Sequence, residues 1–270
     1  MVSKVWFITG TSRGFGRAWT EAALRRGDKV AAAARDVQTL AALAAEYGSA
    51  VLPLALDVTQ RDDVFSAIER AADHFGRLDV VTCNAGYGLF ATVEETSEAA
   101  ARRQFETNFF GALWTLQAAL PIFRRQGAGH FLVVSSLAGV ITFPTAGLYN
   151  ASKWAVEGLC ETLAKETEDF GIRTTLIEPG GYATDWRGSS AHHEPRMPAY
   201  DALRQKVASA YGGRALGAPE ATAQAVLRCV DDESPPLRLL LGESALATVK
   251  KVYAERLAIW DAWADVSARV

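Results

Sequence analysis

The chain has 270 residues, of which 49% are hydrophobic and 22% are charged, an ordinary globular composition with ample material for a buried core. The formal net charge of -3 argues against a nucleic-acid partner, because phosphate binding needs a basic face. No apolar run is long enough to span a bilayer, so we expect a cytoplasmic protein with no membrane partner.

Short β-rich runs alternate along the chain with long alanine-rich stretches. The first run, within MVSKVWFITG, lacks the charged leader, long apolar segment and cleavage site of a signal peptide, and it predicts a buried strand. The predicted strands are 5–9, 29–34, 50–56, 78–83, 130–136, 173–179 and 237–241, and the predicted helices are 15–27, 36–47, 60–75, 97–125, 149–170, 219–231 and 244–265. Thr59 is a candidate N-cap of the third helix, and Gly27, Gly48 and Gly76 are candidate helix stops.

The predicted strands show little polar alternation, which is typical of a parallel sheet with helices on both faces. We therefore expect an α/β fold, a Rossmann-type, doubly wound, parallel seven-stranded sheet flanked by helices, in a single domain over 1–270. Residues 184–218 interrupt the alternation after a strand and are rich in Gly, Ser, His and Pro. We expect 184–212 to form a helical lid and 243–270 a C-terminal helical extension.

The cysteines and histidines do not indicate a metal site or a disulfide framework. Cys83, Cys160 and Cys229 are odd in number and scattered, without the close pairing that zinc ligands show. His192 and His193 are adjacent, but no acidic residue or cysteine near them completes a ligand pattern. We expect no metal.

A glycine-rich loop follows the first predicted strand and opens the first predicted helix. It reads Thr9-Gly10-Thr11-Ser12-Arg13-Gly14-Phe15-Gly16. Glycines let the backbone turn tightly and approach a pyrophosphate at a helix N-terminus, where free N–H groups and the helix dipole favour anions. A glycine-rich turn alone can be purely structural, but its position after the first strand favours dinucleotide binding.

The end of the second predicted strand indicates which dinucleotide is bound. An acidic residue at this edge would bind the adenosine ribose of NAD, whereas an arginine accepts the 2′-phosphate of NADP. Ala34 stands where the acid would be, Arg35 follows it, and Arg13 of the glycine loop is within plausible reach of the same phosphate. Two guanidiniums can make charge-assisted contacts that NAD cannot satisfy, so we expect NADP(H).

Tyr149 and Lys153 are four residues apart and lie on the same face of a predicted helix. A nearby ammonium stabilises a phenolate, which predicts a Tyr149 pKa lowered toward the working pH of a general acid/base. Ser136 ends the fifth predicted strand and can reach the same cleft at the carboxyl edge of the sheet. Strand alternation lets only one of Ser135 and Ser136 face that cleft.

Taken in order, these motifs resemble the short-chain dehydrogenase/reductase family over about residues 3–242. The resemblance implies a catalytic set of Asn108, Ser136, Tyr149 and Lys153. It implies that the cofactor is bound by Gly10, Thr11, Ser12, Arg13, Gly14, Phe15, Gly16, Arg35, Asp57, Val58, Asn84, Ala85, Gly86, Tyr149, Lys153, Pro179, Gly180, Tyr182 and Thr184. Two positions depart from the family pattern: Val133 replaces a common strand asparagine, and Tyr182 replaces a common aliphatic residue.

The resemblance implies an oxidoreductase that moves hydride between NADP(H) and a carbonyl or secondary alcohol. Tyr149 would donate the proton, Lys153 would lower its pKa and bind the nicotinamide ribose, Ser136 would hold the substrate oxygen, and Asn108 would position a relay water. A small apolar substrate is expected from an apolar and aromatic lining formed by Gly86, Tyr87, Gly88, Leu89, Phe90, Phe143, Tyr182, Trp186 and Met197. The alternatives are a non-catalytic NADP-sensing or scaffold protein on the same fold, and an epimerase or dehydratase.

The predicted helices over 97–125 and 149–170 carry apolar residues beyond a single core stripe: Leu113, Trp114, Leu116, Ala155 and Leu159. In the resembled family such helices pack across a two-fold axis, so we expect a homodimer or homotetramer. The final helix holds Val252, Leu257, Ile259, Trp260 and Trp263. These residues could either add to that interface or cap the core.

Overall fold

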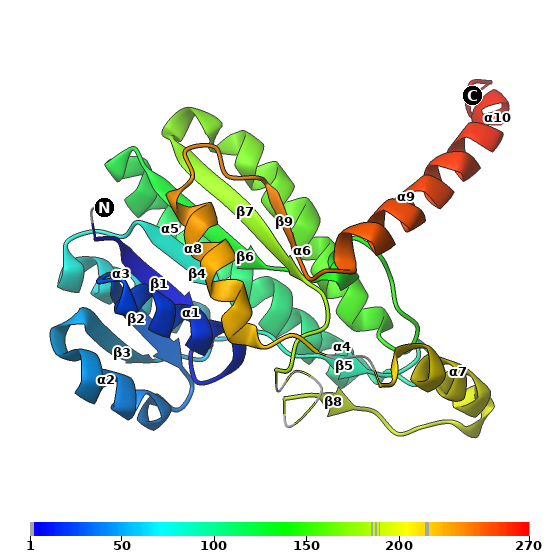
Figure 1. Cartoon of the computed structure of the whole chain (residues 1–270), viewed down its shortest axis with the longest axis horizontal. Coiled ribbons are helices and arrows are strands. Elements are labelled where there is room, and N and C mark those ends of the chain that lie inside the picture. The colour runs from blue at the N-terminus through cyan, green and yellow to red at the C-terminus, as the bar shows by residue number, and fades with distance from the viewer. Residues whose placement is uncertain (1–2, 185, 187, 189, 214–215, 270) are drawn as a thin grey trace.

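The computed structural model describes residues 3–184, 186, 188, 190–213 and 216–269 (Figure 1). Within them, seven parallel strands form one sheet in the order β3-β2-β1-β4-β6-β7-β9. The strands are β1 (Val5–Thr9), β2 (Lys29–Ala34), β3 (Val51–Ala55), β4 (Val80–Cys83), β6 (Gly129–Val134), β7 (Ile172–Pro179) and β9 (Arg238–Leu241). The strand order reverses between β1 and β4, which is the doubly wound topology that places a ligand at the carboxyl ends of these strands. The predicted fold class is confirmed.

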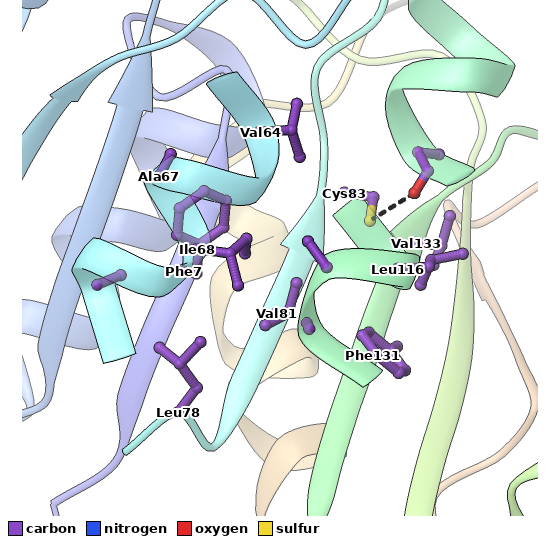
Figure 2. Close-up of a cluster of buried hydrophobic side chains, with 14 of the residues drawn as sticks. Phe7, Val64, Ala67, Ile68, Leu78, Val81, Cys83, Leu116, Phe131 and Val133 are labelled. Atoms are coloured by element: carbon purple, nitrogen blue, oxygen red, sulfur yellow. Dashed lines mark hydrogen bonds between the residues drawn. The ribbon is translucent and has the colours of Figure 1, made fainter. Parts of the chain in front are cut away.

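Helices cover both faces of the sheet, and each face has its own buried cluster. One face carries α1 (Gly14–Arg25), α2 (Ala41–Tyr47) and α8 (Ala223–Asp231), and the other carries α3 (Arg61–Phe75), α5 (Gly111–Gln126) and α6 (Gly147–Glu166). Figure 2 shows the second cluster, where Phe7, Val81 and Phe131 of neighbouring strands lie beneath Ile68 of α3 and Leu116 of α5. Burial on both faces is the reason that the strands carry so few polar residues.

Two predicted helices have different bounds in the structure. The helix expected over 97–125 is α4 (Glu98–Phe105), a π-helical turn (Glu106–Phe110) and then α5. The helix expected over 149–170 is α6, which begins at Gly147, and the chain then forms a 3-10 turn over Glu168–Phe170. Elsewhere 3-10 turns over Val37–Leu40 and Pro219–Thr222 lead into α2 and α8.

The three predicted helix stops are confirmed, whereas the predicted N-cap is not. Gly27, Gly48 and Gly76 all follow helix ends with positive φ values of 92°, 52° and 79°, as expected for stops. The N-cap prediction for Thr59 is wrong, because Gln60 occupies that position. Thr59 instead donates from its backbone N–H (3.0 Å) and hydroxyl (2.9 Å) to one carboxylate oxygen of Asp57.

The insertion after β7 contains a helix, as predicted. It forms β8 (His192–His193), a 3-10 turn (Pro198–Tyr200) and α7 (Asp201–Tyr211). β8 pairs in parallel with β5 (Leu89–Phe90), and the sequence predicted neither of these two-residue strands. The role of the insertion as a lid stays a prediction.

The C-terminal helices α9 (Ala245–Ala262) and α10 (Ala264–Ser267) project away from the body of the molecule (Figure 1). They carry seven of the exposed large hydrophobic side chains in the described part of the chain: Leu246, Tyr253, Leu257, Ile259, Trp260, Trp263 and Val266. Capping of the core, one of the two roles left open for this helix, is therefore excluded. Leu116, in contrast, lies in the core with 2% of its side chain exposed and cannot serve an interface. Among the described helices, none is both long and apolar enough to cross a membrane.

Candidate active site

The loop between β1 and α1 folds so closely that two of its glycines cannot be replaced without a clash. A Cβ at Gly16 would lie 2.3 Å from the Gly10 carbonyl oxygen. A Cβ at Gly10, where φ is +71°, would lie 2.9 Å from Nδ2 of Asn84. The helix α1 begins at Gly14 with no acidic residue in its first turn. Its first N–H groups are therefore suited to hold a phosphate against the tight loop.

Two of the predicted cofactor-binding residues shape this loop. Thr11 donates from its backbone N–H and its hydroxyl to the Ala33 carbonyl, both at 3.0 Å, which ties the loop to the end of β2. Asn84, after β4, donates its side-chain amide to the carbonyls of Thr9 (2.8 Å) and Gly10 (3.0 Å). The side chains of Thr11 and Asn84 thus hold the loop between its two neighbouring strands.

Arg13 and Arg35 lie at adjacent ends of β1 and β2, because Thr9 and Ala33 are paired in the sheet register. Both arginines are exposed. Asp36, which follows Arg35 in the sequence, accepts the Gln38 N–H at 3.0 Å and so is engaged with the backbone. A hollow of about 380 Å³ lies beside the loop, and its lining residues are Arg13, Gly14, Ala183, Thr184, Ala218, Pro219 and Glu220. The tight loop and the helix start together fit the pyrophosphate of a dinucleotide.

The segment after β7 lies against the same loop. A Cβ at Gly14 would be 3.6 Å from Cγ2 of Thr184. The rings of Tyr182 and Phe15 pack edge to face with their centroids 5.3 Å apart. Thr184 therefore lies next to the glycine loop and Tyr182 packs on Phe15 of α1, while the contact of Thr184 with the nicotinamide stays a prediction.

Other predicted cofactor residues have visible structural roles. Val58 is buried, and a Cβ at Gly111 of α5 would come within 2.7 Å of its Cγ2. Gly180, after the end of β7, donates its N–H to the Leu241 carbonyl at 2.8 Å and so extends the pairing with β9. These contacts position the strand ends around the loop.

Tyr149 and Lys153 lie one turn apart on α6 at the carboxyl edge of the sheet, with only 6% and 5% of their surface exposed. Lys153 Nζ donates to the Val134 carbonyl at 2.7 Å and lies 5.9 Å from the centre of the Tyr149 ring. Ser136 follows β6, and its side chain hydrogen-bonds Tyr149 while its Oγ also accepts the Ala138 N–H at 3.1 Å. A phenol, a serine hydroxyl and an ammonium therefore converge, as the spacing predicted.

Burial dominates the ionisation of both groups. Burial raises the pKa of Tyr149 to about 12, and hydrogen bonds from Ser136 and Trp186 lower it only in part. Burial lowers the pKa of Lys153 to about 8, opposed by the nearby Glu157. The expected lowering of the Tyr149 pKa toward the working pH is wrong, because the loss of solvation that penalises the phenolate outweighs its stabilisation by a nearby ammonium.

The π-helical turn brings Asn108 into the same region. Asn108 is 2% exposed, and its side chain makes two 3.1 Å hydrogen bonds, accepting the Tyr87 N–H and donating to the Tyr87 carbonyl. A Cβ at Gly86 would lie 3.1 Å from Oδ1 of Asn108 and 3.7 Å from Nζ of Lys153. Asn108 and Lys153 thus flank Gly86, and a π turn inserted into a helix is a common device at functional sites.

Aromatic side chains enclose Tyr149. The ring centroid of Trp186 lies 4.9 Å from that of Tyr149 and 4.9 Å from that of Phe90. Phe143 packs into the same cluster with Ala138 and Tyr149. The predicted lining is therefore formed in part by Phe90, Phe143 and Trp186.

Three residues of the predicted lining lie elsewhere, which corrects that prediction. Leu89 is 1% exposed and points into the core, because successive side chains of β5 face opposite ways. Tyr182 packs on Phe15, beside α1. Met197 is 38% exposed and has its N–H bound to Glu95.

Glu95 holds the insertion, and no sequence signal pointed to it. Its carboxylate accepts the N–H groups of Met197 (2.6 Å) and Thr92 (2.9 Å) and pairs with the guanidinium of Arg204 on α7. The Glu95 side chain is 1% exposed. Hydrogen bonds from the backbone of Met197 and Thr92, and from Arg204, lower its pKa to about 2.

The comparisons with known proteins agree with this geometry. The sequence profile of the short chain dehydrogenase family matches residues 4–195. Oxidoreductase BOA17 of Botryotinia fuckeliana is 40% identical over 271 residues, spanning 98% of each chain. A short-chain dehydrogenase structure from Streptomyces avermitilis matches with a TM-score of 0.91 and 33% identity, covering 100% of this chain and 99% of that one.

An archaeal relative extends the comparison. The alcohol dehydrogenase of Thermococcus sibiricus, solved in complex with 5-hydroxy-NADP, matches with a TM-score of 0.75 and 31% identity over 89% of this chain and 96% of that one. The profile match covers more than half of the chain, and the sheet order, glycine loop and Tyr149–Lys153 pair accord with it. This chain is an oxidoreductase that belongs to the short chain dehydrogenase family.

Proposed function

We propose that the chain transfers hydride between NADP(H) and a carbonyl or secondary alcohol of a small, largely apolar substrate. The observation that carries the proposal is the convergence of Tyr149, Ser136 and Lys153 at the carboxyl edge of the sheet, close to a loop shaped for a dinucleotide. A phenol that can give or take a proton is the group that a carbonyl–alcohol conversion requires.

The residues divide the chemistry among them. A bound nicotinamide supplies or accepts the hydride. Tyr149 keeps its proton at neutral pH, since burial raises its pKa to about 12, and it donates that proton to the substrate oxygen. Ser136 gives the same oxygen a second hydrogen bond. Lys153 stabilises the phenolate that Tyr149 leaves behind.

Asn108 and the aromatic cluster complete the site. Asn108 is fixed by Tyr87 and, like Lys153, lies next to Gly86, which suits it to hold a water from which a proton passes by way of Lys153 to the Tyr149 phenolate. Phe90, Phe143 and Trp186 surround Tyr149 with apolar surface, which favours an apolar substrate.

The preference for NADP(H) is supported by Arg13 and Arg35 and by the engagement of Asp36 with the backbone. The alcohol dehydrogenase of Thermococcus sibiricus was solved with an NADP derivative, which accords with this choice.

A panel of ketones and alcohols, followed by the absorbance of NADPH, tests the proposal. We expect at least one apolar ketone to be reduced with NADPH, and much more slowly with NADH. NADPH binding without turnover of any substrate would instead support a sensor or scaffold protein. The cytoplasmic location expected from the sequence stays a prediction.

We also propose that the chain assembles as a homodimer or homotetramer. Leu113, Trp114 and Leu159 remain partly exposed on α5 and α6, and five large apolar side chains of α9 are exposed: Leu246, Tyr253, Leu257, Ile259 and Trp260. Both features suit an interface between copies.

A further inference from the structure

Two buried carboxyl groups lie on α6, which carries Lys153, and on β7, which packs against α6. Glu157 is one turn after Lys153 on α6 and is 4% exposed, and Glu178 on β7 is 1% exposed. We call Glu157 and Glu178 the acid pair. Charged groups are rarely buried to this extent unless they are paired.

One guanidinium serves the acid pair. Nε of Arg238 lies 2.9 Å from Oε2 of Glu157 and 3.5 Å from Oε1 of Glu178. A second nitrogen of Arg238 bonds Glu161 at 2.8 Å, and Glu161 is 41% exposed. Arg238 is thus shared among three carboxyl groups, too few positive charges for all three to be ionised in a buried site.

A proton held by the acid pair removes one negative charge and so makes up for this shortage of positive charge. Burial and the neighbouring Glu157 raise the pKa of Glu178 far above that of an ordinary carboxyl. Oε1 of each member is buried and makes no hydrogen bond within the described residues. A proton shared by the two carboxyls would satisfy these oxygens and leave the pair with a single negative charge.

The acid pair and Lys153 belong to one packed unit. Lys153 is anchored on the Val134 carbonyl, and the next residue, Ser135, donates its N–H to Ile177 at 2.8 Å, directly before Glu178. A Cβ at Gly139 would lie 2.4 Å from Oγ of Ser135 and 3.1 Å from Oε1 of Glu157. Movement of the acid pair is therefore coupled to the anchor of Lys153.

The other titratable groups that act on Lys153 are neutral at physiological pH. Burial raises the pKa of Cys83 on β4 to about 12 and that of Cys160 on α6 well above its ordinary value. Tyr149, also on α6, keeps its proton. With Arg238 matched by Glu161, the negative charge that balances Lys153 comes, within the described residues, from the acid pair.

We propose that Glu157 and Glu178 act as one positioning unit that carries a single shared negative charge and keeps Lys153 charged in a site where burial would otherwise discharge it. The inference rests on the proposed function, in which the Lys153 ammonium stabilises the Tyr149 phenolate. It gives these two buried acids, which lie outside the substrate site, a role in that function.

The shared charge makes a specific prediction for a set of variants. Either Glu157→Gln or Glu178→Gln leaves the remaining carboxyl free to ionise, so each single variant retains one negative charge. The double variant removes it. We expect the titration midpoint of Lys153 to change little in each single variant and to fall by about one pH unit in the double variant.

The midpoint is measured by NMR titration of 13C-labelled lysine side chains, with the Lys153 signal assigned from a Lys153→Met variant. Glu166→Gln is the matched control, since it removes an exposed carboxylate from the last turn of the same helix, and we expect it to leave the midpoint unchanged. A double variant that titrates like the parent overturns the proposal, as do single variants whose shifts add up to that of the double.

A second measurement does not depend on the double variant folding. Infrared spectra of the parent at neutral pH should contain the band of a buried protonated carboxyl, and either single variant should lose it. A parent without that band overturns the shared proton. Neither measurement needs turnover, so failure of the parent to oxidise NADPH with any ketone would refute the proposed function separately.

Discussion

Tyr149 lies beside an ammonium and is also almost fully buried, and these two influences act on its pKa in opposite directions. An ammonium favours the phenolate, whereas burial disfavours either charged form. Burial prevails, because the pKa of Tyr149 is raised to about 12 and that of Lys153 is lowered to about 8. At neutral pH Tyr149 is therefore a proton donor next to a charged lysine.

Replacing Tyr149 with phenylalanine tests that role. Tyr149→Phe keeps the ring that packs on Trp186 but removes the proton donor, so we expect kcat to fall by about 10²–10⁴-fold. Binding of NADPH, measured by its fluorescence, should be retained. Tyr47→Phe on α2, remote from the site, is the control and should keep kcat. A Tyr149→Phe variant with nearly normal kcat would show that another group is the acid.

Cofactor choice is also decided by single residues. Arg35→Asp replaces a cation at the end of β2 with a carboxylate, which repels a 2′-phosphate and can bind a ribose hydroxyl. We expect the ratio of kcat/KM with NADPH to that with NADH to fall by at least about tenfold, the value of one charge-assisted hydrogen bond.

The charge-conserving variant Arg35→Lys is the control for this change and should keep most of the preference for NADPH. Equal kcat/KM values with both cofactors in the parent protein would contradict the assignment.

Among the elements, those with long regular patterns could be predicted from the sequence, and those set by tertiary contacts could not. The seven strands of the main sheet were visible as apolar runs, since both of their faces are buried. The π turn at Asn108 carries no pattern of its own, because its neighbours all read as helix. β5 and β8 were missed since each has two residues and forms only by pairing with the other.

The site residues divide in the same way, into those that sequence spacing predicts and those that depend on tertiary contacts. Tyr149, Lys153 and Ser136 were identified from their spacing and order, which the topology converts into proximity. Glu95 and the acid pair were not, because each gains its role from a partner on a distant element, Arg204 for Glu95 and Arg238 for the acid pair. Burial, which decides the pKa of Tyr149, is likewise a property of the assembled fold.

The insertion that holds α7 is attached mainly through polar contacts, which makes its opening testable. Glu95→Gln removes the charge that binds Arg204, a loss of about 1.5–3 kcal/mol for a charged hydrogen bond. We expect amide hydrogen exchange in α7 to accelerate by at least about tenfold. Glu98→Gln, which removes an exposed carboxylate on α4, is the control.

Acid and cofactor should act on the same attachment. The folded pKa of Glu95 is about 2 against an ordinary 4.5, so its contribution to stability is present above pH 4.5 and is lost as pH falls toward 2.

NADP⁺ should slow amide hydrogen exchange in the insertion, because Thr184 at its base lies next to the glycine loop. Equal exchange with and without NADP⁺ would contradict a lid.

At the scale of the whole molecule, α9 projects away from the body (Figure 1) and leaves large apolar side chains exposed to solvent. Arg256 ties its middle to the body through the Val140 carbonyl (3.0 Å) and the ring of Trp154 (5.0 Å). Beyond that point Trp260 and Trp263 are 67% and 62% exposed. A lone helix with such residues is marginal in water and gains stability from packing against a partner.

The spacing and charges of α9 favour a second copy of the chain as that partner. Leu246, Tyr253 and Trp260 recur every seventh residue and share one face of the helix. Lys250 and Lys251 lie in its N-terminal half, while Asp261 lies at its C-terminal end and Asp265 follows in α10. Two copies packed antiparallel about a two-fold axis would set each basic half against the acidic half of its partner.

Charge exchange tests this arrangement. In the variant with both Lys250→Glu and Lys251→Glu, acidic residues face acidic residues at both ends of the helix pair. Each exposed ion pair contributes about 0.2–1 kcal/mol, so we expect the dimer Kd to rise about tenfold. Adding Asp261→Lys and Asp265→Lys to the same chain restores opposite charges and should restore the Kd. Light scattering and sedimentation at micromolar concentrations measure the assembly, with Lys206→Glu, a reversal of an exposed charge on α7, as the control. A parent that is monomeric would refute the assembly, and charge variants with an unchanged Kd would show that the copies meet elsewhere, for example through Leu113 and Leu159.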